Sequence, residues 1–178
     1  QYATHHRTGE PIPAGWVDAL VAGRQSSGHH TLELLKAMIL DQAWHQTPLA
    51  ELPASGADVE DFEAAALERA GVAFPLVPPR YRSAYFHHIF GGGYSAGYYS
   101  YLWSEVMDAD TVAWFAEQAE STDDGSSPSS LITRSAGERF RRELLARGGS
   151  IEALETYRRF RGRDPEVSHL LARIGLSA

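Results

Sequence analysis

The stretch that most constrains this chain is residues 86–103, where a run of glycine precedes closely spaced tyrosines. Residues 91–93 are all glycine, so their backbone can reach conformations that other residues avoid, at an entropic cost. Tyr94, Tyr98 and Tyr101 follow at helical spacing, which predicts one face carrying all three rings. Each phenol combines an apolar ring with a hydroxyl that donates or accepts a hydrogen bond, so this face suits either a core or a polar ligand.

Two nucleotide-binding interpretations of these glycines fail. A phosphate-binding P-loop requires Lys followed by Ser or Thr after its last glycine, whereas Tyr98 follows Gly97. A dinucleotide-binding motif follows a strand, and no strand-like run leads into this stretch. On spacing alone, a stripe of aromatic residues is more often part of a core than of a site.

The remaining sequence predicts an all-α chain, because apolar residues recur at helical spacing and no segment alternates with a period of two. The predicted helices include residues 29–45, 59–69, 80–90, 97–107 and 111–119, followed by further helices to the C-terminus. The length of 178 residues predicts a single helical domain, 1–178. Residues 120–130 are mostly Ser and Asp, with one Gly, one Pro and no large apolar residue, which predicts a mobile surface loop.

Local signals predict several helix ends and core positions. Ser135 and Glu138 match a capping box. The pair at 164–165, Asp followed by Pro, matches an N-cap with proline at the first helical position. Tyr99, Trp103 and Val106 share a second apolar stripe after the glycines, which we assign to the core.

Composition excludes several classes of function. A net charge of −7 argues against nonspecific nucleic-acid binding and against binding to an anionic membrane surface. The chain has no cysteine, so it has neither a disulfide framework nor a thiolate metal site, and a reducing, cytoplasmic location is expected. No apolar run is long enough to span a bilayer, so no membrane partner is expected.

The segment "YRSAYFHHIFGGGYSAGYYSYLWSEVMD" resembles the C-terminal signature of the zinc-dependent oligopeptidases of the thimet oligopeptidase and bacterial peptidyl-dipeptidase group. "HHRTGEPIP" near the start and "GERFRRELLARGGS", "YRRFRGRDPEV" and "HLLARIGL" near the end extend the resemblance over most of the chain. The peptidyl-dipeptidase branch fits best, because His88 precedes Tyr94 by the spacer Ile-Phe-Gly-Gly-Gly. The resemblance implies a C-terminal segment of a larger, mostly helical catalytic domain.

Peptidases of this group bind zinc through a His-Glu-x-x-His motif, in which two imidazoles hold the metal and the glutamate activates a water. No histidine in this chain is followed by glutamate, so the motif is absent. In the family the third ligand also precedes the segment that matches Gln1. We therefore expect zinc in the full-length enzyme, no metal ligand in this chain, and a missing N-terminal part of the same enzyme as its partner.

The resemblance implies that the chain contributes substrate contacts to the active site. His88, Tyr94 and Tyr101 would be the catalytic residues, with Tyr101 as the main hydrogen-bond donor to the oxyanion of the tetrahedral intermediate. Gly92, Gly93 and Tyr98 would line the substrate site, and the glycines would let the loop close over a short peptide. The implied reaction releases dipeptides from the C-terminus of short peptides.

The sequence leaves a second interpretation open. The chain could be a non-catalytic helical module that binds peptides or a partner protein, or a split half that assembles with a separate chain carrying His-Glu-x-x-His. The helix predicted over 29–45 is apolar around most of its circumference, which is typical of a helix buried in something larger. On either interpretation the isolated chain is expected to be inactive.

Overall fold

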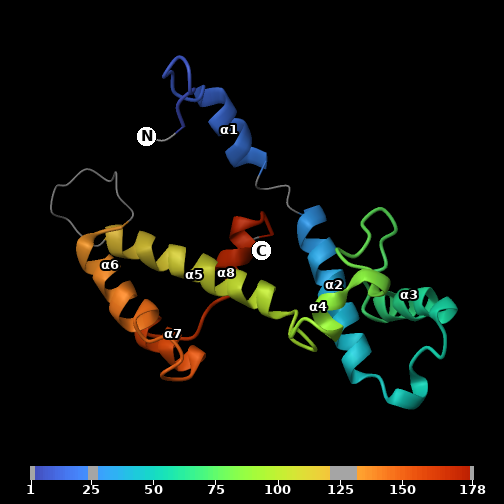
Figure 1. Ribbon diagram of the computed structural model, residues 1–178. Coiled ribbons are helices and arrows are strands. Elements are labelled where there is room, and N and C mark those ends of the chain that lie inside the picture. Colours follow the sequence, from blue (N-terminus) through green and yellow to red (C-terminus); the bar gives the residue numbers. More distant parts are fainter. Residues whose placement is uncertain (1–2, 24–27, 121–131, 177–178) are drawn as a thin grey trace. The chain divides into compact units, whose positions relative to one another are not determined.

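A computed structural model describes residues 3–23, 28–120 and 132–176, and shows eight α-helices there, with no sheet (Figure 1). The prediction of an all-α chain is confirmed. The helices are α1 (Ala14–Gly23), α2 (Gly28–Gln46), α3 (Val59–Arg69), α4 (His87–Phe90), α5 (Ser100–Glu120), α6 (Arg134–Phe140), α7 (Ala153–Arg161) and α8 (Ser168–Arg173). Short 3-10 turns precede α3 and α4, and a π-helical turn, Arg141–Leu145, continues α6.

The chain divides into two compact units, Gln1–Leu102 and Trp103–Ala178. The boundary falls inside α5, and each unit has its own hydrophobic core. The predicted single domain over 1–178 stays a prediction. Residues 121–130 of the predicted mobile loop lie outside the described residues.

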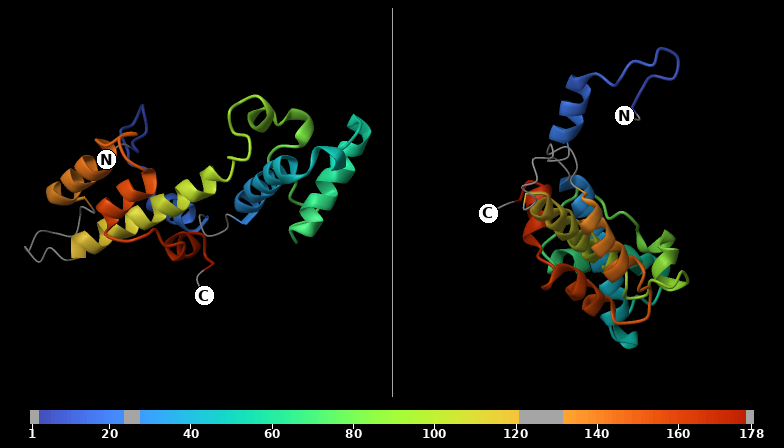
Figure 2. Two further views of the ribbon diagram at one scale, coloured as in Figure 1. Left: turned by 90° about the horizontal axis from the view of Figure 1, so that it is seen from below. Right: turned by 90° about the vertical axis from the view of Figure 1, so that its left-hand side faces the viewer.

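Helix α2 is the centre of the first unit because it is buried on two sides. Ala37 and Met38 pack with Phe86 and Ile89, which come from the turn before α4 and from α4 itself. Leu40 belongs to a second cluster formed with residues of α3, which lies beside α2 in Figures 1 and 2. Burial on both sides accounts for the apolar residues around most of this helix.

Two buried charged groups hold the segment that connects α3 to α4. Lys36, the one lysine in the sequence, donates from Nζ to the carbonyl oxygens of Phe74 at 2.7 Å and Val77 at 2.6 Å. Burial lowers the pKa of Lys36. Glu63 of α3 is also buried, and accepts from the guanidinium of Arg82 and from the backbone amide of Ser83. These bonds satisfy charges that would otherwise be costly to bury.

The second unit packs α6 and α7 against α5 (Figure 2). Trp114 and Phe160 lie in this core, with ring centroids 4.5 Å apart. Asp110 of α5 is fully buried and accepts from the Tyr157 hydroxyl at 2.7 Å and from Arg161 Nε at 3.1 Å. Arg163, just after α7, donates to the same carboxylate at 2.9 Å. This ion cluster therefore fixes α7 and the segment after it onto α5.

The prediction of separate helices over 97–107 and 111–119 is wrong, because α5 runs without a break from Ser100 to Glu120. Residues 108–110 contain no glycine or proline that would break the helix. The carboxylate of Asp110 accepts a hydrogen bond from Tyr157 of α7 instead of capping a new helix. The core assignment of the second stripe is confirmed for Val106, which is buried, but is wrong for Tyr99 and Trp103, whose side chains are exposed.

Two predicted caps are replaced by other residues. Thr133, not Ser135, caps α6, with its Oγ1 accepting from the Ala136 amide at 3.2 Å. Glu138 binds Arg141 instead of completing a capping box. The last helix begins at Ser168, later than predicted, and Asp164 forms an ion pair with Arg158 instead of capping it.

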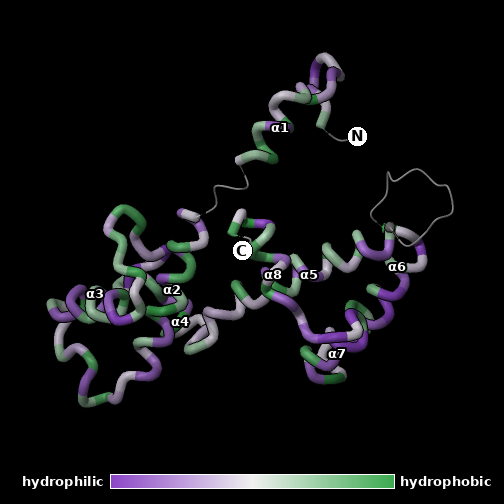
Figure 3. The backbone as a smooth tube through the Cα atoms, turned by 180° about the vertical axis from the view of Figure 1, so that it is seen from behind, coloured by the Kyte–Doolittle hydropathy of each residue, from purple (hydrophilic) through white to green (hydrophobic). Residues whose placement is uncertain are grey.

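Helix α1 has no buried residue, and Trp16, Leu20 and Val21 are exposed on it. Figure 3 colours this helix mostly white to green, in keeping with its single charged residue, Asp18. Within the described ranges, the structure contains no helix with the length and hydropathy needed to cross a membrane.

Candidate functional site

The predicted site residues lie on α4, at the start of α5, and on the segment between them. We call residues 91–99 the glycine–tyrosine loop. The chain forms turns over 95–99 and becomes helical only at Ser100, so Tyr94 and Tyr98 precede the helix. The prediction of a single helical face for the three tyrosines is therefore wrong.

The structure nevertheless brings the three tyrosine rings together. The ring centroids of Tyr98 and Tyr101 are 4.9 Å apart, and those of Tyr94 and Tyr98 are 6.1 Å apart. Tyr94 and Tyr101 stack nearly parallel, with centroids 5.9 Å apart and 16° between the rings. We call these three residues the tyrosine cluster.

The members of the tyrosine cluster differ in exposure. Tyr98 is only 4% exposed and belongs to the core of the first unit. Tyr94 and Tyr101 are 37% and 42% exposed, so their rings reach solvent. The cluster is thus anchored by one buried ring and presents two accessible phenols.

His88 lies beside this cluster and has an unpaired nitrogen. Its ring centroid is 6.3 Å from that of Tyr94, 6.2 Å from that of Tyr98 and 4.7 Å from that of Tyr81. Its Nδ1 atom is buried and has no hydrogen-bond partner. Buried polar atoms are nearly always paired, so an unpaired one next to accessible phenols needs an explanation.

Both Tyr101 and Tyr98 have raised pKa values, for different reasons. The side-chain hydrogen bond with Tyr94 is the main cause that raises the pKa of Tyr101. Burial is the main cause that raises the pKa of Tyr98. Both phenols therefore keep their protons at neutral pH and can donate hydrogen bonds.

Two glycines of the loop are required for two different reasons. A Cβ on Gly92 would lie 2.8 Å from the Cα of His88, so any side chain there would push the loop away from α4. Gly93 has open space around it, but its φ of 84° is one that other residues rarely adopt. The observed path of the loop thus depends on glycine at both positions, while its closure over a peptide stays a prediction.

Two residues of α2 hold the loop, and neither was predicted from the sequence. Asp41 is fully buried and accepts from the backbone amides of Ala96 at 2.8 Å and Tyr98 at 2.9 Å. Gln42 Nε2 donates to the carbonyl oxygen of Ala96 at 2.9 Å. The signal that could have revealed Asp41 is its charge, because a carboxylate in a helix this apolar needs a partner.

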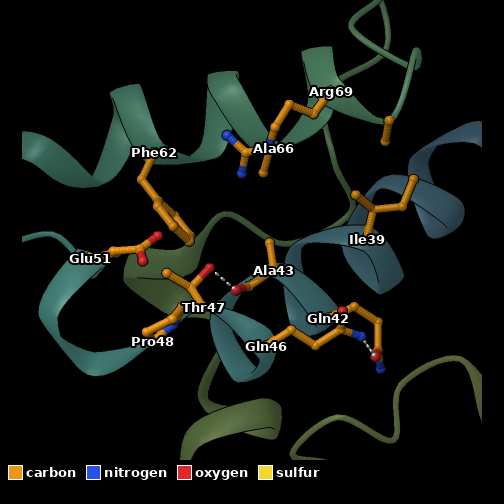
Figure 4. Close-up of a pocket in the computed structure, with 11 residues that line it drawn as sticks. Ile39, Gln42, Ala43, Gln46, Thr47, Pro48, Glu51, Phe62, Ala66 and Arg69 are labelled. Atoms are coloured by element: carbon orange, nitrogen blue, oxygen red, sulfur yellow. Dashed lines mark hydrogen bonds between the residues drawn. The ribbon is translucent and has the colours of Figure 1, made fainter.

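A cavity of about 660 Å³ lies between α2 and α3 (Figure 4). Ile39, Ala43 and Phe62 are among its apolar lining residues, and Glu51 and Arg69 add opposite charges. Gln42 also lines it, as Figure 4 shows. The predicted site residues do not line this cavity.

The described residues do not fit a metal. Among 3–23, 28–120 and 132–176, no group of three or more His, Asp or Glu side chains is placed to hold an ion. Zinc, which the resemblance implies, would thus need ligands from elsewhere, and we derive no step through it.

Comparison with known proteins relates the chain to one family of peptidases. Residues 1–176 match the family model described as peptidase family M3. Over 99% of its length the chain is 39% identical to the dipeptidyl carboxypeptidase of Escherichia coli K12 and 40% identical to that of Salmonella typhimurium. It is 33% identical to the oligopeptidase A of E. coli over 97% of its length. The chain spans about a quarter of each of these relatives, 24%, 24% and 23%.

Proposed function

Because this chain belongs to peptidase family M3, we propose that it supplies the substrate-binding and oxyanion-binding part of a metallopeptidase active site. The observation that carries this proposal is the stacking of two accessible phenol rings, Tyr94 and Tyr101, beside the unpaired Nδ1 of His88. Hydrogen-bond donors of this kind suit a peptide, whose backbone offers carbonyl oxygens at regular intervals.

Each residue has a proposed role. When water attacks a peptide carbonyl, negative charge develops on its oxygen, and a donor aimed at that oxygen lowers the barrier. Tyr101 would be this donor, because its raised pKa keeps the phenol protonated. His88 and Tyr94 would hold the substrate backbone, with Gly92 and Gly93 allowing it to approach the loop closely. Tyr98, whose ring is buried in the core, would support the substrate site by packing beneath it rather than by contacting the peptide.

We propose short peptides as substrates, with release of C-terminal dipeptides. In support, the two relatives named dipeptidyl carboxypeptidase are 39% and 40% identical to the chain, against 33% for oligopeptidase A. The catalytic zinc and its ligands would come from another part of the same enzyme, which is the proposed partner of this chain. A cytoplasmic location stays a prediction.

A second candidate function is a non-catalytic module that binds a partner protein. The exposed apolar residues of α1, Trp16, Leu20 and Val21, favour it, because such a face often marks an interface. The two functions differ in one measurable respect. Only the first predicts that removing the Tyr101 hydroxyl changes the rate of peptide hydrolysis.

Tyr101→Phe in the protein at its natural length tests the first function. We expect kcat to fall about 100- to 1000-fold with little change in KM, because the donor acts mainly in the transition state. Tyr99→Phe is the matched control, since this exposed tyrosine lies outside the tyrosine cluster. Steady-state hydrolysis of a short peptide measures both. An unchanged kcat for Tyr101→Phe would remove this residue from the mechanism.

A further inference from the structure

We propose that Asp41 is a positioning residue, whose buried carboxylate sets where the Tyr94 and Tyr101 hydroxyls lie. The proposal rests on the proposed function, since it assigns Asp41 a part in presenting the phenols to a substrate. Asp41 itself faces the interior and would contact neither substrate nor metal.

The carboxylate binds two peptide groups of the glycine–tyrosine loop. Its Oδ1 accepts from the Ala96 amide at 2.8 Å, and its Oδ2 accepts from the Tyr98 amide at 2.9 Å. His45 Nδ1, one turn further along α2, lies 3.0 Å from the same Oδ1. Hydrogen bonds from amides to an ionised carboxylate are stronger than those between neutral groups, so each oxygen holds one point of the loop.

The loop adopts an unfavourable conformation between these two points. Ala96 has a φ of 54°, the one positive φ at a non-glycine residue in the described part of the chain. Strained residues of this kind persist only where their surroundings hold them. Asp41 binds the amide of Ala96 and Gln42 binds its carbonyl at 2.9 Å, so α2 holds both sides of the strained residue.

The position of the loop determines the position of the phenols. Fixing the Tyr98 amide places the Tyr98 ring in the core, where it packs with Phe86 at a centroid distance of 4.8 Å. The rings of Tyr101 and Tyr94 lie 4.9 Å and 6.1 Å from the Tyr98 ring. A small shift of Tyr98 would therefore move both accessible hydroxyls.

Asp41→Asn in the protein at its natural length tests this inference. The amide replaces one acceptor oxygen with a donor, so either Ala96 or Tyr98 loses its partner. We expect kcat to fall about 10- to 100-fold while KM changes less than about threefold, because small misplacements of catalytic groups slow chemistry. We also expect hydrogen exchange of the loop amides to rise about tenfold or more, as local opening becomes easier.

Leu40→Ala is the matched control, because Leu40 is equally buried on the same helix but packs toward α3 rather than the loop. It should destabilise α2 without faster exchange at Ala96 and Tyr98 and without loss of kcat in the folded enzyme. Ala96→Gly added to Asp41→Asn should recover at least about threefold in kcat, since glycine adopts this φ without strain.

The outcomes separate the two proposals. Equal kcat for Asp41→Asn and Leu40→Ala at equal folded fraction would overturn the positioning role, as would unchanged exchange of the loop amides in Asp41→Asn. If the unsubstituted protein with its zinc hydrolyses no peptide, the proposed function fails. Exchange would then still show whether Asp41 holds the loop.

Discussion

At the scale of single residues, the glycine–tyrosine loop is specified by contacts that only the folded chain reveals. Gly92 is required because the backbone of His88 passes close to it, whereas Gly93 is required for its left-handed backbone. In the sequence both residues belong to the same run of glycine, so the two reasons cannot be told apart there. Substitution can separate the two requirements.

We expect Gly92→Ala to disturb the site more than Gly93→Ala. The new methyl group at 92 meets backbone 2.8 Å away, which cannot move without displacing α4 or the loop. Alanine at 93 meets nothing, and its left-handed backbone costs roughly 1–2 kcal/mol. Peptide hydrolysis and thermal unfolding of both variants measure the difference.

Gly97→Ala is the control for this pair, because its Cβ would make an ordinary contact at 3.5 Å with the Tyr94 carbonyl oxygen. It should leave stability and turnover close to those of the parent. A Gly93→Ala variant that is less active than Gly92→Ala would show that the steric explanation is wrong.

The sequence grouped the three tyrosines but did not show what holds them. The spacing of Tyr94, Tyr98 and Tyr101 predicts that their rings lie together, although the helix that this spacing predicts starts only at Ser100, and their role in a site stays a prediction from the resemblance. Asp41 was missed because its partners are backbone amides more than fifty residues away, which leave no pattern in the sequence.

At the scale of helices, ends marked by glycine depend on more local features than ends marked by side-chain caps. Gly71 and Gly175 follow α3 and α8, and both have a positive φ. A left-handed residue after a helix is a local property that glycine satisfies by itself. Thr133 and Ser135 could each cap α6 by residue type, and only the folded backbone shows that Thr133 does so.

The junction of α5 and α7 should be sensitive to alkaline pH. Burial, followed by the hydrogen bond to Asp110, raises the pKa of Tyr157 to about 12 from an ordinary value of 10.0. The folded state thus holds this proton more tightly than the unfolded chain does. Its contribution to stability is complete below pH 10.0 and is lost as the pH rises through about 12.

We therefore expect the stability difference between the parent and Tyr157→Phe to narrow as the pH rises above 10.0. The rise of the pKa from 10.0 to about 12 corresponds to a loss of about 3 kcal/mol of stability when the phenol is fully ionised. Urea unfolding followed by tryptophan fluorescence from pH 8 upward, at about half-unit steps, measures this gap. Tyr99→Phe, at an exposed position, should show a constant difference instead.

At the scale of the whole molecule, the all-α class followed from periodicity, but the division into two units did not. The boundary lies within α5, between Leu102 and Trp103, where nothing in the sequence marks a linker. The two units have separate cores, one around Met38 and one around Trp114. The sequence does not show which apolar residues share a core, because this depends on contacts between distant segments.

The purified chain should bind no stoichiometric zinc and cleave no peptide. The chain lacks His-Glu-x-x-His, and within the described residues no set of side chains is placed to hold a metal. Elemental analysis after dialysis, together with a peptide hydrolysis assay, measures both properties. Stoichiometric zinc with activity that is lost on chelation would contradict this expectation.

The buried ammonium group of Lys36 can be used to detect opening of the first unit, because a reagent reaches it only when the unit opens. It is the one lysine of the chain, and it is enclosed by the carbonyl groups of Phe74 and Val77. In the native fold no lysine side chain is therefore available to amine-directed reagents or to a lysine-specific protease. The rate of acylation or cleavage at Lys36 would therefore measure how often the first unit opens, without an engineered label.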